Sequence, residues 1–243
     1  MQERLHMSHH PGANPPPFEA SVIDVTDDSL ILSQSYCYPR GGGQPGDTGL
    51  FIRDGIGREF SETLGGEFIR HPVDEIADFS VGDEVSCVIN GERRNRHASM
   101  HTAQHIISAL ADDLWGAETV GNQISTEYTR IDFLFPNRDE YDSETLADAV
   151  NSVIGSGTLV NVHEWPRDAV KEHEHMRHTN FMERIPSSIT ELRVVEIEGI
   201  DLCPCAGTHV GSTNDLEPIV ITSVKSKGAG KFRITYRFEN EIT

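Results

Sequence analysis

The sequence predicts an α+β fold in which a small antiparallel β-barrel-like domain precedes a separate α+β domain. Short alternating segments punctuated by turns fill residues 18–90, whereas helical periods mixed with strand-like runs fill residues 91–243. Residues 1–17 carry a proline-rich run and no apolar periodicity, so we expect a disordered tail there. Because 37% of the 243 residues are hydrophobic, the chain can bury a sizeable core.

The first domain is predicted from strands with period two. Residues 21–25 and 29–33 alternate in this way on either side of an Asp-Asp turn, and Val81-Gly82-Asp83 marks another turn. Several short strands with regular turn signals are typical of an antiparallel barrel or sandwich.

The second domain is predicted from longer periods. Helical periodicity covers residues 97–114 and 143–154, and strand-like runs cover residues 129–135, 192–197 and 218–224. We also expect residues 219–238 to form a hairpin whose connection is residues 226–231.

The formal net charge of −19 is the strongest compositional signal. Such a surface usually repels nucleic acid, but it also suits a protein adapted to molar salt, where charges are screened over about 3 Å. We favour adaptation to high salt. No run approaches the roughly 20 apolar residues that cross a bilayer, and no signal peptide is evident, so we expect a cytoplasmic protein without membrane contact.

Two histidines share one face of the first predicted helix. His101 and His105 are four residues apart, which places both imidazoles on one side of a helix, near enough to share a metal. The apolar stripe of this helix lies on the opposite side, so the core does not require the histidines. Taken alone, this spacing is more often a local hydrogen-bonding arrangement than a metal site.

A second pair of ligand types follows much later. Cys205 and His209 are four residues apart in a short loop behind Gly207. His101 and His105 together with Cys205 and His209 form a nitrogen-rich donor set that suits tetrahedral zinc, and the combination is a stronger signal than either pair. With just four cysteines in the chain, metal binding is favoured over a disulfide framework. Cys203 is expected to be a buried thiol or a substitute ligand.

These motifs resemble the HxxxH and CxxxH signatures of the editing domain of alanyl-tRNA synthetases and of their freestanding relatives, the AlaX proteins. Residues 202–210 are similar to the family's Cys-x-Cys-Gly-Gly-Thr-His segment, with Ala206 in place of the first glycine. Residues 38–49 resemble the family's glycine-rich motif. Three motifs in family order indicate the medium-length AlaX type, which lacks the aminoacylation domain of the synthetase.

The resemblance implies a zinc-dependent hydrolase that removes a wrongly attached amino acid from alanine tRNA, chiefly serine and secondarily glycine. It assigns metal binding and catalysis to four side chains, which are His101, His105, Cys205 and His209. It nominates Thr102 to read the serine hydroxyl, although a helical threonine can instead bond its own backbone. The segment formed by Gly41, Gly42, Gly43 and Gln44 is implied to shape the substrate site.

Three further positions depart from the family pattern. Arg40 stands where an acidic residue is common, and Thr119 and Asn122 stand where synthetase editing domains often carry glutamine and serine. The polar contacts to the substrate therefore do not carry over at these positions.

Reasoning from the residues alone leaves other functions open. Four protein ligands are typical of a closed structural site, so a catalytic site would need one ligand to be displaced. A non-enzymatic, zinc-stabilised RNA-binding module is therefore an alternative, and a zinc hydrolase of small acyl or amide substrates is a third. No Lys-Ser/Thr follows the glycine-rich run, which argues against a nucleotide P-loop and ATP binding.

Basic residues are scarce and grouped. As candidate contacts to tRNA phosphates we take two groups in the second domain, which are Arg93, Arg94 and Arg96, and Lys225, Lys227, Lys231, Arg233 and Arg237. The remaining histidine cluster, which has no partner cysteine, is expected at the surface and comprises His163, His173, His175 and His178.

Overall fold

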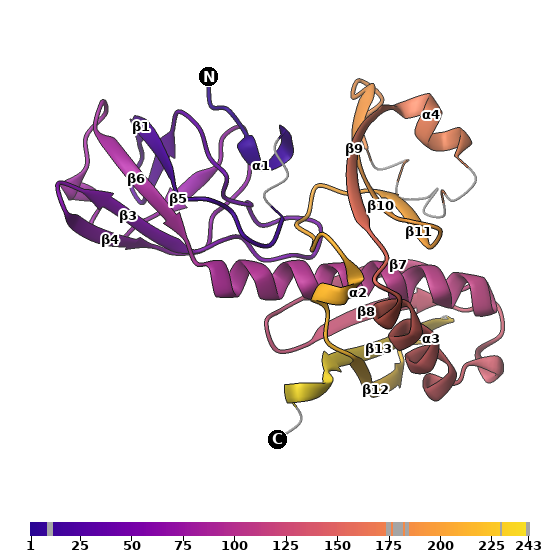
Figure 1. The fold of residues 1–243 in the computed structure, drawn as a ribbon. Coiled ribbons are helices and arrows are strands. Elements are labelled where there is room, and N and C mark those ends of the chain that lie inside the picture. The colour runs from indigo at the N-terminus through magenta and orange to yellow at the C-terminus, as the bar shows by residue number, and fades with distance from the viewer. Residues whose placement is uncertain (9–11, 174–175, 177–181, 183–184, 229, 242–243) are drawn as a thin grey trace. The chain divides into compact units, whose positions relative to one another are not determined.

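In the computed structural model the chain divides into two compact units, Met1–Ala98 and Ser99–Thr243. The structure describes residues 1–243 except 9–11, 174–175, 177–181, 183–184, 229 and 242–243 (Figure 1). Helix α2, Gly91–Trp115, begins in the first unit and continues into the second. Among the described residues, no helix is long and apolar enough to cross a membrane.

The first unit is built on one antiparallel sheet of six strands in the order β4-β3-β6-β1-β2-β5 (Figure 1). The strands are β1 (Phe18–Val25), β2 (Ser29–Leu32), β3 (Gly49–Arg53), β4 (Ile56–Phe60), β5 (Arg70–Pro72) and β6 (Glu84–Ile89). A bridge between Phe60 and Val73 joins the two edges of the sheet, so the sheet is partly closed. The predicted barrel-like architecture is confirmed.

Strand alternation fills the core of this unit. In β1, the buried residues Phe18, Ala20 and Val22 alternate with more exposed ones, as a half-buried strand requires. They join a single apolar cluster that also contains Leu30, Leu32, Phe51, Phe60, Val73, Phe79 and Val85.

The amino-terminal residues differ from the expected tail. Helix α1 spans Leu5–Ser8, and Leu5 is buried. The side chain of Gln2 accepts a hydrogen bond from the backbone N–H of Ile69 at 2.6 Å and donates to the carbonyl of Leu32 at 3.0 Å. An anchor made by one amide side chain and one leucine leaves no periodic signal in the sequence.

In its described residues, the second unit contains two antiparallel sheets, most of α2 and further helices. One sheet has the order β12-β13-β8-β7, and the other has the order β11-β10-β9 (Figure 1). The strands are β7 (Glu118–Ile124), β8 (Thr129–Leu134), β9 (Val160–Pro166), β10 (Glu191–Ile197), β11 (Asp201–Pro204), β12 (Ile219–Ser226) and β13 (Lys231–Phe238). The helices after α2 are α3 (Ser143–Ser156) and α4 (Arg167–Glu172).

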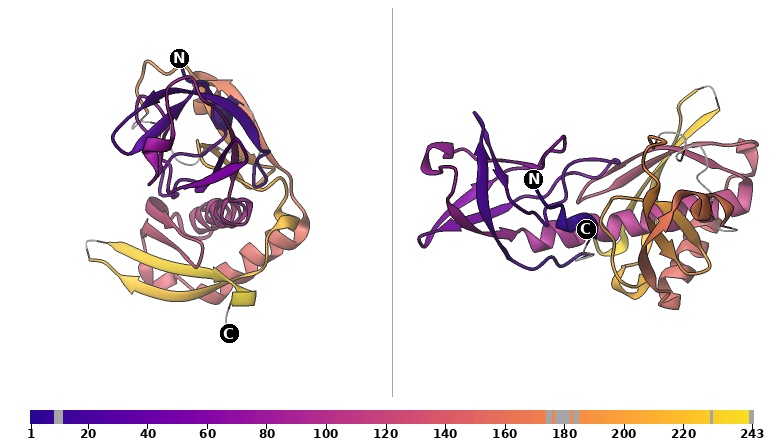
Figure 2. Two further views of the ribbon diagram at one scale, coloured as in Figure 1. Left: turned by 90° about the vertical axis from the view of Figure 1, so that its left-hand side faces the viewer. Right: turned by 90° about the horizontal axis from the view of Figure 1, so that it is seen from above.

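These elements confirm the predicted helices and the predicted hairpin. Helix α2 begins at Gly91 rather than at residue 97, because its first residues are charged and polar and so carry no apolar period. Asp142 caps α3 by accepting a hydrogen bond from the backbone N–H of Thr145 at 2.7 Å. The ends of β12 and β13 that lie toward their connection project from the rest of the second unit in both views of Figure 2.

One face of the four-stranded sheet is packed and the other is open to solvent. Along β13, the buried aromatic and aliphatic side chains occupy every second position, and these are Phe232, Ile234, Tyr236 and Phe238. The hydroxyl of Tyr236 donates to the carbonyl of Met100 in α2, and α3 packs against β12. This inner face therefore fixes the position of the helix that carries both predicted histidine ligands.

Candidate metal centre

The four predicted ligands come together within the second unit. Nitrogen atoms of His101, His105 and His209 and the sulfur of Cys205 all lie within 4.8 Å of one another. His101 and His105 project from α2, whereas Cys205 and His209 follow strand β11. The backbone N–H of Cys205 donates to the carbonyl of Arg193 at 3.1 Å, which extends the β10–β11 pairing to the cysteine.

Burial is nearly complete at this cluster. The exposed fractions of His101, His105 and His209 are 3%, 4% and 0%, whereas Cys205 is partly exposed. The Sγ atom of Cys205 lies 3.6 Å from Nε2 of His101 and 3.5 Å from Nε2 of His209. Three buried imidazoles around one sulfur form a compact donor set.

The cluster favours a thiolate. Burial acts to raise the pKa of the Cys205 thiol, but the charge of His101 and hydrogen bonds from the three histidines hold this pKa well below its ordinary value. Burial lowers the pKa of His101, and burial together with the charge of His101 lowers the pKa of His209 well below its usual range. For these three residues, a thiolate beside the neutral imidazoles of His101 and His209 is the protonation state in which they bind a metal.

His105 differs from the other two histidines because it has a carboxylate partner. Its Nδ1 donates to Oδ2 of Asp201 at 2.8 Å, and the Asp201 side chain is fully buried. Burial acts to lower the pKa of His105, but the hydrogen bonds to Asp201 and Cys205 raise it to about 10. Because Nδ1 is occupied in this way, Nε2 is the nitrogen left to face the cluster.

Asp201 is a site residue that motif spacing did not indicate. It lies at the start of β11, four residues before Cys205, and its exposed fraction is 1%. The sequence did offer one signal. Asp201 stands among apolar residues just before the second ligand pair, and a carboxylate that is buried there needs a partner.

Thr102 contacts the cluster through His209. Its Oγ1 lies 3.1 Å from Nδ1 of His209 and accepts a hydrogen bond from the backbone N–H of Val210 at 3.2 Å. The side chain is completely buried. Thr102 therefore holds the second ligand pair against α2.

Cys203 lies outside the group of four. Its thiol is buried and donates to the carbonyl of Pro204 at 3.5 Å, and burial raises the pKa of the thiol well above its ordinary value. These properties match those of a buried structural cysteine.

A polar hydrogen-bonded group lies along α2 next to the ligands. The Gln104 amide donates to Oγ of Ser108 at 2.8 Å and accepts from the Asn122 amide at 3.1 Å. Thr119 donates to the same Ser108 oxygen at 2.8 Å. Both positions that depart from the family pattern in β7, Thr119 and Asn122, are thus bonded to α2 within the second unit.

The glycine-rich segment lies in the first unit and forms a tight turn. The backbones of Gly41 and Gln44 exchange hydrogen bonds of 3.1 and 2.8 Å, while Gly42 and Gly43 adopt positive φ angles of 56° and 84°. Gly42 and Gly43 are exposed, whereas Gln44 is buried. A Cβ atom on the nearby Gly46 would lie 2.1 Å from the carbonyl oxygen of Thr63, so this position also requires glycine.

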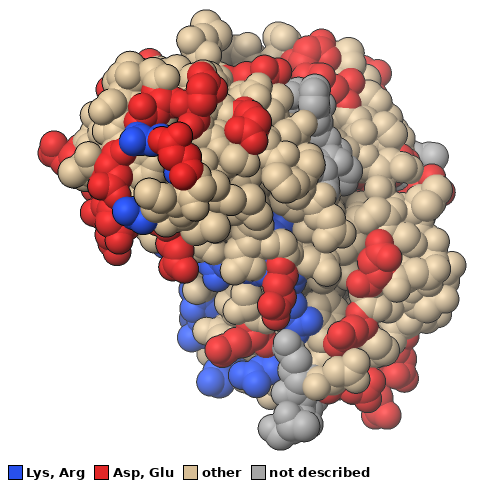
Figure 3. Space-filling view, turned by 60° about the vertical axis from the view of Figure 1, so that its left-hand side comes forward, with Lys and Arg blue, Asp and Glu red and all other residues tan. Residues whose placement is uncertain are grey.

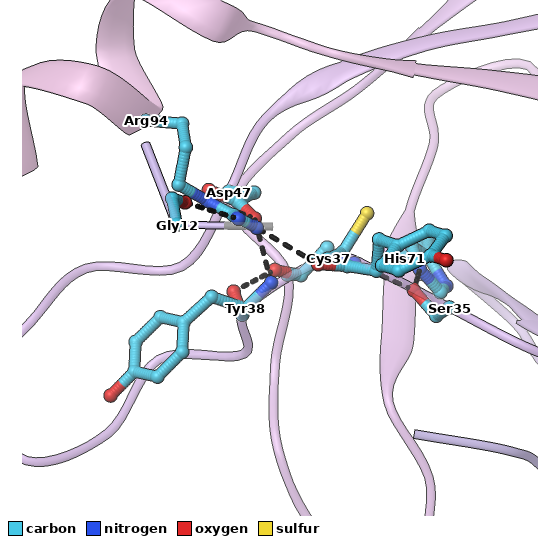
Figure 4. Close-up of polar contacts among 9 residues, drawn as sticks. Gly12, Ser35, Cys37, Tyr38, Asp47, His71 and Arg94 are labelled. Carbon is cyan, nitrogen blue, oxygen red and sulfur yellow. Dashed lines mark hydrogen bonds and ion pairs between the residues drawn. The ribbon is translucent and has the colours of Figure 1, made fainter. Parts of the chain in front are cut away.

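A buried ion pair anchors this segment (Figure 4). Asp47 accepts from the backbone N–H of Tyr38 at 2.6 Å and pairs with Arg94, and both charged side chains are fully buried. Arg94 also donates to the carbonyl of Tyr36 at 2.9 Å. The expectation that Arg94 contacts tRNA phosphate is therefore wrong, because its guanidinium is committed inside the first unit.

His163 and His173, which were expected at the surface, are partly exposed and make side-chain contacts. His163 is half-buried in β9, where it hydrogen-bonds Glu196 at 2.7 Å and stacks on Trp165. The ring of His173 lies 5.6 Å from the ring of Trp165. His175 and His178 fall outside the described residues.

Comparisons with known proteins connect this geometry to tRNA. Residues 192–235, which include Cys205 and His209, match the family model described as the threonyl and alanyl tRNA synthetase second additional domain. The chain is 36% identical over 231 residues to the alanyl-tRNA editing protein AlaX-M of Methanosarcina acetivorans, covering 90% of this chain and 93% of that protein. It is 32% identical over 222 residues to the AlaX-M protein of Saccharolobus solfataricus, covering 90% and 92%.

A longer protein shows the same similarity over part of its length. The alanine–tRNA ligase of Pyrococcus furiosus is 30% identical to this chain over 226 residues, a match that covers 90% of this chain but 24% of the ligase.

Proposed function

Because the chain belongs to the AlaX-M family of alanyl-tRNA editing proteins, we propose that it deacylates mischarged alanine tRNA, with seryl-tRNA(Ala) as chief substrate and glycyl-tRNA(Ala) as second substrate. The observation that carries this proposal is the buried group of three imidazoles and one thiolate. We place this reaction in the cytoplasm, where aminoacylated tRNA is used.

The donor set fits zinc. A tetrahedral zinc with bonds of about 2.3 Å to sulfur and about 2.1 Å to nitrogen holds these ligand atoms about 3.6 Å apart. The distances from Cys205 Sγ to Nε2 of His101 and of His209 are 3.6 and 3.5 Å. His101, His105, Cys205 and His209 would therefore hold the ion.

The reaction is the hydrolysis of an ester between an amino acid and a ribose hydroxyl. When bound, zinc would supply Lewis acidity toward the ester carbonyl and toward water. Asp201 keeps the His105 ring in one orientation, and Thr102 does the same for His209. The partly exposed side of Cys205 is the side from which an ester could approach. A four-ligand site would need to open one position for this chemistry.

Selection between amino acids has a physical basis. An alanine pocket rejects serine weakly, whereas a second site that hydrogen-bonds the serine hydroxyl can leave alanine untouched. We propose Thr102 for this role, since its hydroxyl lies beside the ligand His209. The contact to His209 also supports a second role, in which Thr102 positions that ligand. Removing the hydroxyl should affect seryl-tRNA(Ala) more than glycyl-tRNA(Ala) in the first role, and both equally in the second.

Contacts from the first unit are part of the proposal. Gly42 and Gly43 expose backbone groups that could meet the substrate, whereas Gly41 and the buried Gln44 hold the turn between them. Replacing Gly43 by alanine strains the positive φ, so we expect slower deacylation without loss of bound zinc.

The decisive experiment is deacylation of alanine tRNA charged with serine, glycine or alanine. We expect release of serine first, glycine second, and little alanine. A non-enzymatic zinc-stabilised RNA-binding module would release none of the three. A hydrolase of small acyl substrates would cleave a seryl ester without the tRNA.

A further inference from the structure

The outer face of the four-stranded sheet is basic in a strongly acidic chain. The chain as a whole has 20 Lys and Arg against 39 Asp and Glu. Residues 129–134 and 219–238, which form β8, β12, β13 and the hairpin connection, contain six basic residues and one acidic residue, so the balance is reversed there. We call these six residues the basic sheet face: Arg130, Lys225, Lys227, Lys231, Arg233 and Arg237.

Strand register brings these side chains together. Lys225 lies directly opposite Arg233, and Arg233 in turn lies opposite Asp132 of β8. Lys231, Arg233 and Arg237 occupy the positions of β13 that alternate with its buried aromatic and aliphatic residues, so they share the solvent face. Lys and Arg side chains gather in the lower part of the view in Figure 3, the height at which β12 and β13 lie in Figure 1.

The arrangement carries an electrostatic cost. Like charges directly opposite each other in an antiparallel pair, such as Lys225 and Arg233, destabilise the pairing. Asp132 offsets part of this cost through hydrogen bonds of 2.5 and 2.7 Å from Arg233. Glu118 of β7, opposite Leu134, adds a second carboxylate to this face. Two carboxylates cannot neutralise six cations, so the face is left with a net positive charge.

The pKa of Asp132 shows that several of these cations lie close enough together to act on the same carboxylate. The hydrogen bond from Arg233 is the main cause of the lowered pKa of Asp132, and the charges of Arg130 and Lys227 lower it further. The guanidinium carbon of Arg237 lies 6.0 Å from the centre of the Tyr128 ring, which leaves an aromatic side chain beside the cations.

We propose that the basic sheet face binds the RNA backbone of the tRNA, an inference that rests on the proposed function for the identity of the substrate. Cations along β13 repeat at about 7 Å, and neighbouring strands lie about 4.8 Å apart, so the face offers a flat charged surface rather than a pocket for a small anion. The projecting hairpin extends this surface outward (Figure 2). Arginine and lysine on a flat sheet suit the repeated phosphates of a nucleic acid.

RNA is favoured over an anionic membrane by the other residues on this face. The positions of the sheet that accompany the cations include the polar side chains Gln123, Ser223 and Thr235. The two aliphatic residues opposite cations, Leu134 and Val220, are half-buried and short. A membrane-binding surface would add large apolar side chains able to enter the lipid.

The test measures binding of unacylated alanine tRNA, so no bond is hydrolysed. The double variant Lys225→Glu/Lys231→Glu is compared with Arg70→Glu/Lys171→Glu, which changes the net charge equally at exposed positions on β5 and α4. Affinity is measured by fluorescence anisotropy over a KCl series. We expect the sheet variant to bind tRNA at least tenfold more weakly than the unchanged protein. The slope of log affinity against log KCl concentration should become shallower by about two. The control should stay within about twofold.

Several outcomes would overturn the inference. Equal weakening by both variants would assign the effect to the overall charge, and an unchanged affinity of the sheet variant would show that the face does not contact RNA. Stronger binding of the unchanged protein to phosphatidylserine vesicles than to tRNA, lost in the sheet variant, would assign the face to lipid. Circular dichroism checks folding, and Lys225→Gln/Lys231→Gln should give an intermediate loss.

The two proposals can fail separately. If the protein releases no serine from seryl-tRNA(Ala) but still binds unacylated tRNA through Lys225 and Lys231, the proposed function is wrong and the RNA surface stands. If deacylation is normal while the sheet variant binds like the unchanged protein, the RNA surface is wrong.

Discussion

In the candidate metal centre, Nδ1 of His105 donates a 2.8 Å hydrogen bond to Oδ2 of Asp201. The two residues are brought together by the packing of α2 against the strand that leads to Cys205. A carboxylate behind a ligating imidazole fixes the ring orientation and increases the basicity of the opposite nitrogen. The ligand pairs alone do not reveal this relationship.

Asp201→Asn should therefore weaken zinc retention about 10–100-fold, because the amide no longer holds His105 with a charged acceptor. The measurement is competition for zinc with a chromophoric chelator. Asp148→Asn, at an exposed position on α3, is the matched control and should retain zinc normally. Equal zinc affinity in all three proteins would show that Asp201 serves only the fold.

His105→Ala should abolish deacylation and weaken metal retention, because it removes one of four ligands. Zinc content after dialysis and turnover on seryl-tRNA(Ala) measure the two effects. His163→Ala is the control, since His163 lies in β9 and is not in the ligand group. Full zinc occupancy with normal turnover in the His105 variant would contradict the assigned site.

Thr102→Val keeps the size of the side chain and removes its hydroxyl. If Thr102 reads the serine hydroxyl, the variant should lose about 1–3 kcal/mol of transition-state stabilisation on seryl-tRNA(Ala) and less on glycyl-tRNA(Ala). Ratios of kcat/KM on the two substrates measure this. Equal losses accompanied by weaker zinc retention would show that Thr102 acts by positioning His209.

Added salt should increase stability, and it should increase activity when tRNA is saturating, so that weaker phosphate contacts at the basic sheet face do not limit the rate. At a net charge of −19, carboxylates repel one another and the tRNA over about 10 Å at 0.1 M KCl, but over about 3 Å at 1 M. Circular dichroism in the same buffers separates the folding effect from the binding effect. A protein that is fully folded at about 0.1 M KCl and loses activity steadily as salt is added would contradict adaptation to high salt.

The Asp132–Arg233 pair should stabilise the fold at neutral pH and not in acid. Hydrogen bonding from Arg233 lowers the folded-state pKa of Asp132 below its ordinary value of 3.8. The contribution is thus complete above the unfolded pKa and is lost as pH falls through the folded one. Because the pair is partly exposed, we expect Asp132→Asn to cost about 0.5–1 kcal/mol at pH 7. Urea unfolding should show that this difference shrinks toward pH 3, and a constant difference would exclude the ion pair as its cause.

The sequence by itself determined the features that depend on local spacing. Residues four apart on a helix share a face whatever the helix packs against, so His101 and His105 were predictable as a pair. Period-two alternation and a glycine-containing connection likewise predicted the β12–β13 hairpin within a residue or two of its bounds. The donor types of this pair and of the distant pair Cys205 and His209 suggested a shared zinc site. The resemblance to alanyl-tRNA editing proteins added the reaction expected there.

Only the tertiary structure decided which side chains meet across long stretches of chain. Arg94 follows another arginine in a run that looks exposed, yet it is buried against Asp47, because strand pairing carries the glycine-rich segment to the start of α2. Asp132 and Arg233 are brought face to face by the β8–β13 register. Burial and electrostatic pairing depend on such contacts between distant segments, and no local pattern of residues encodes them.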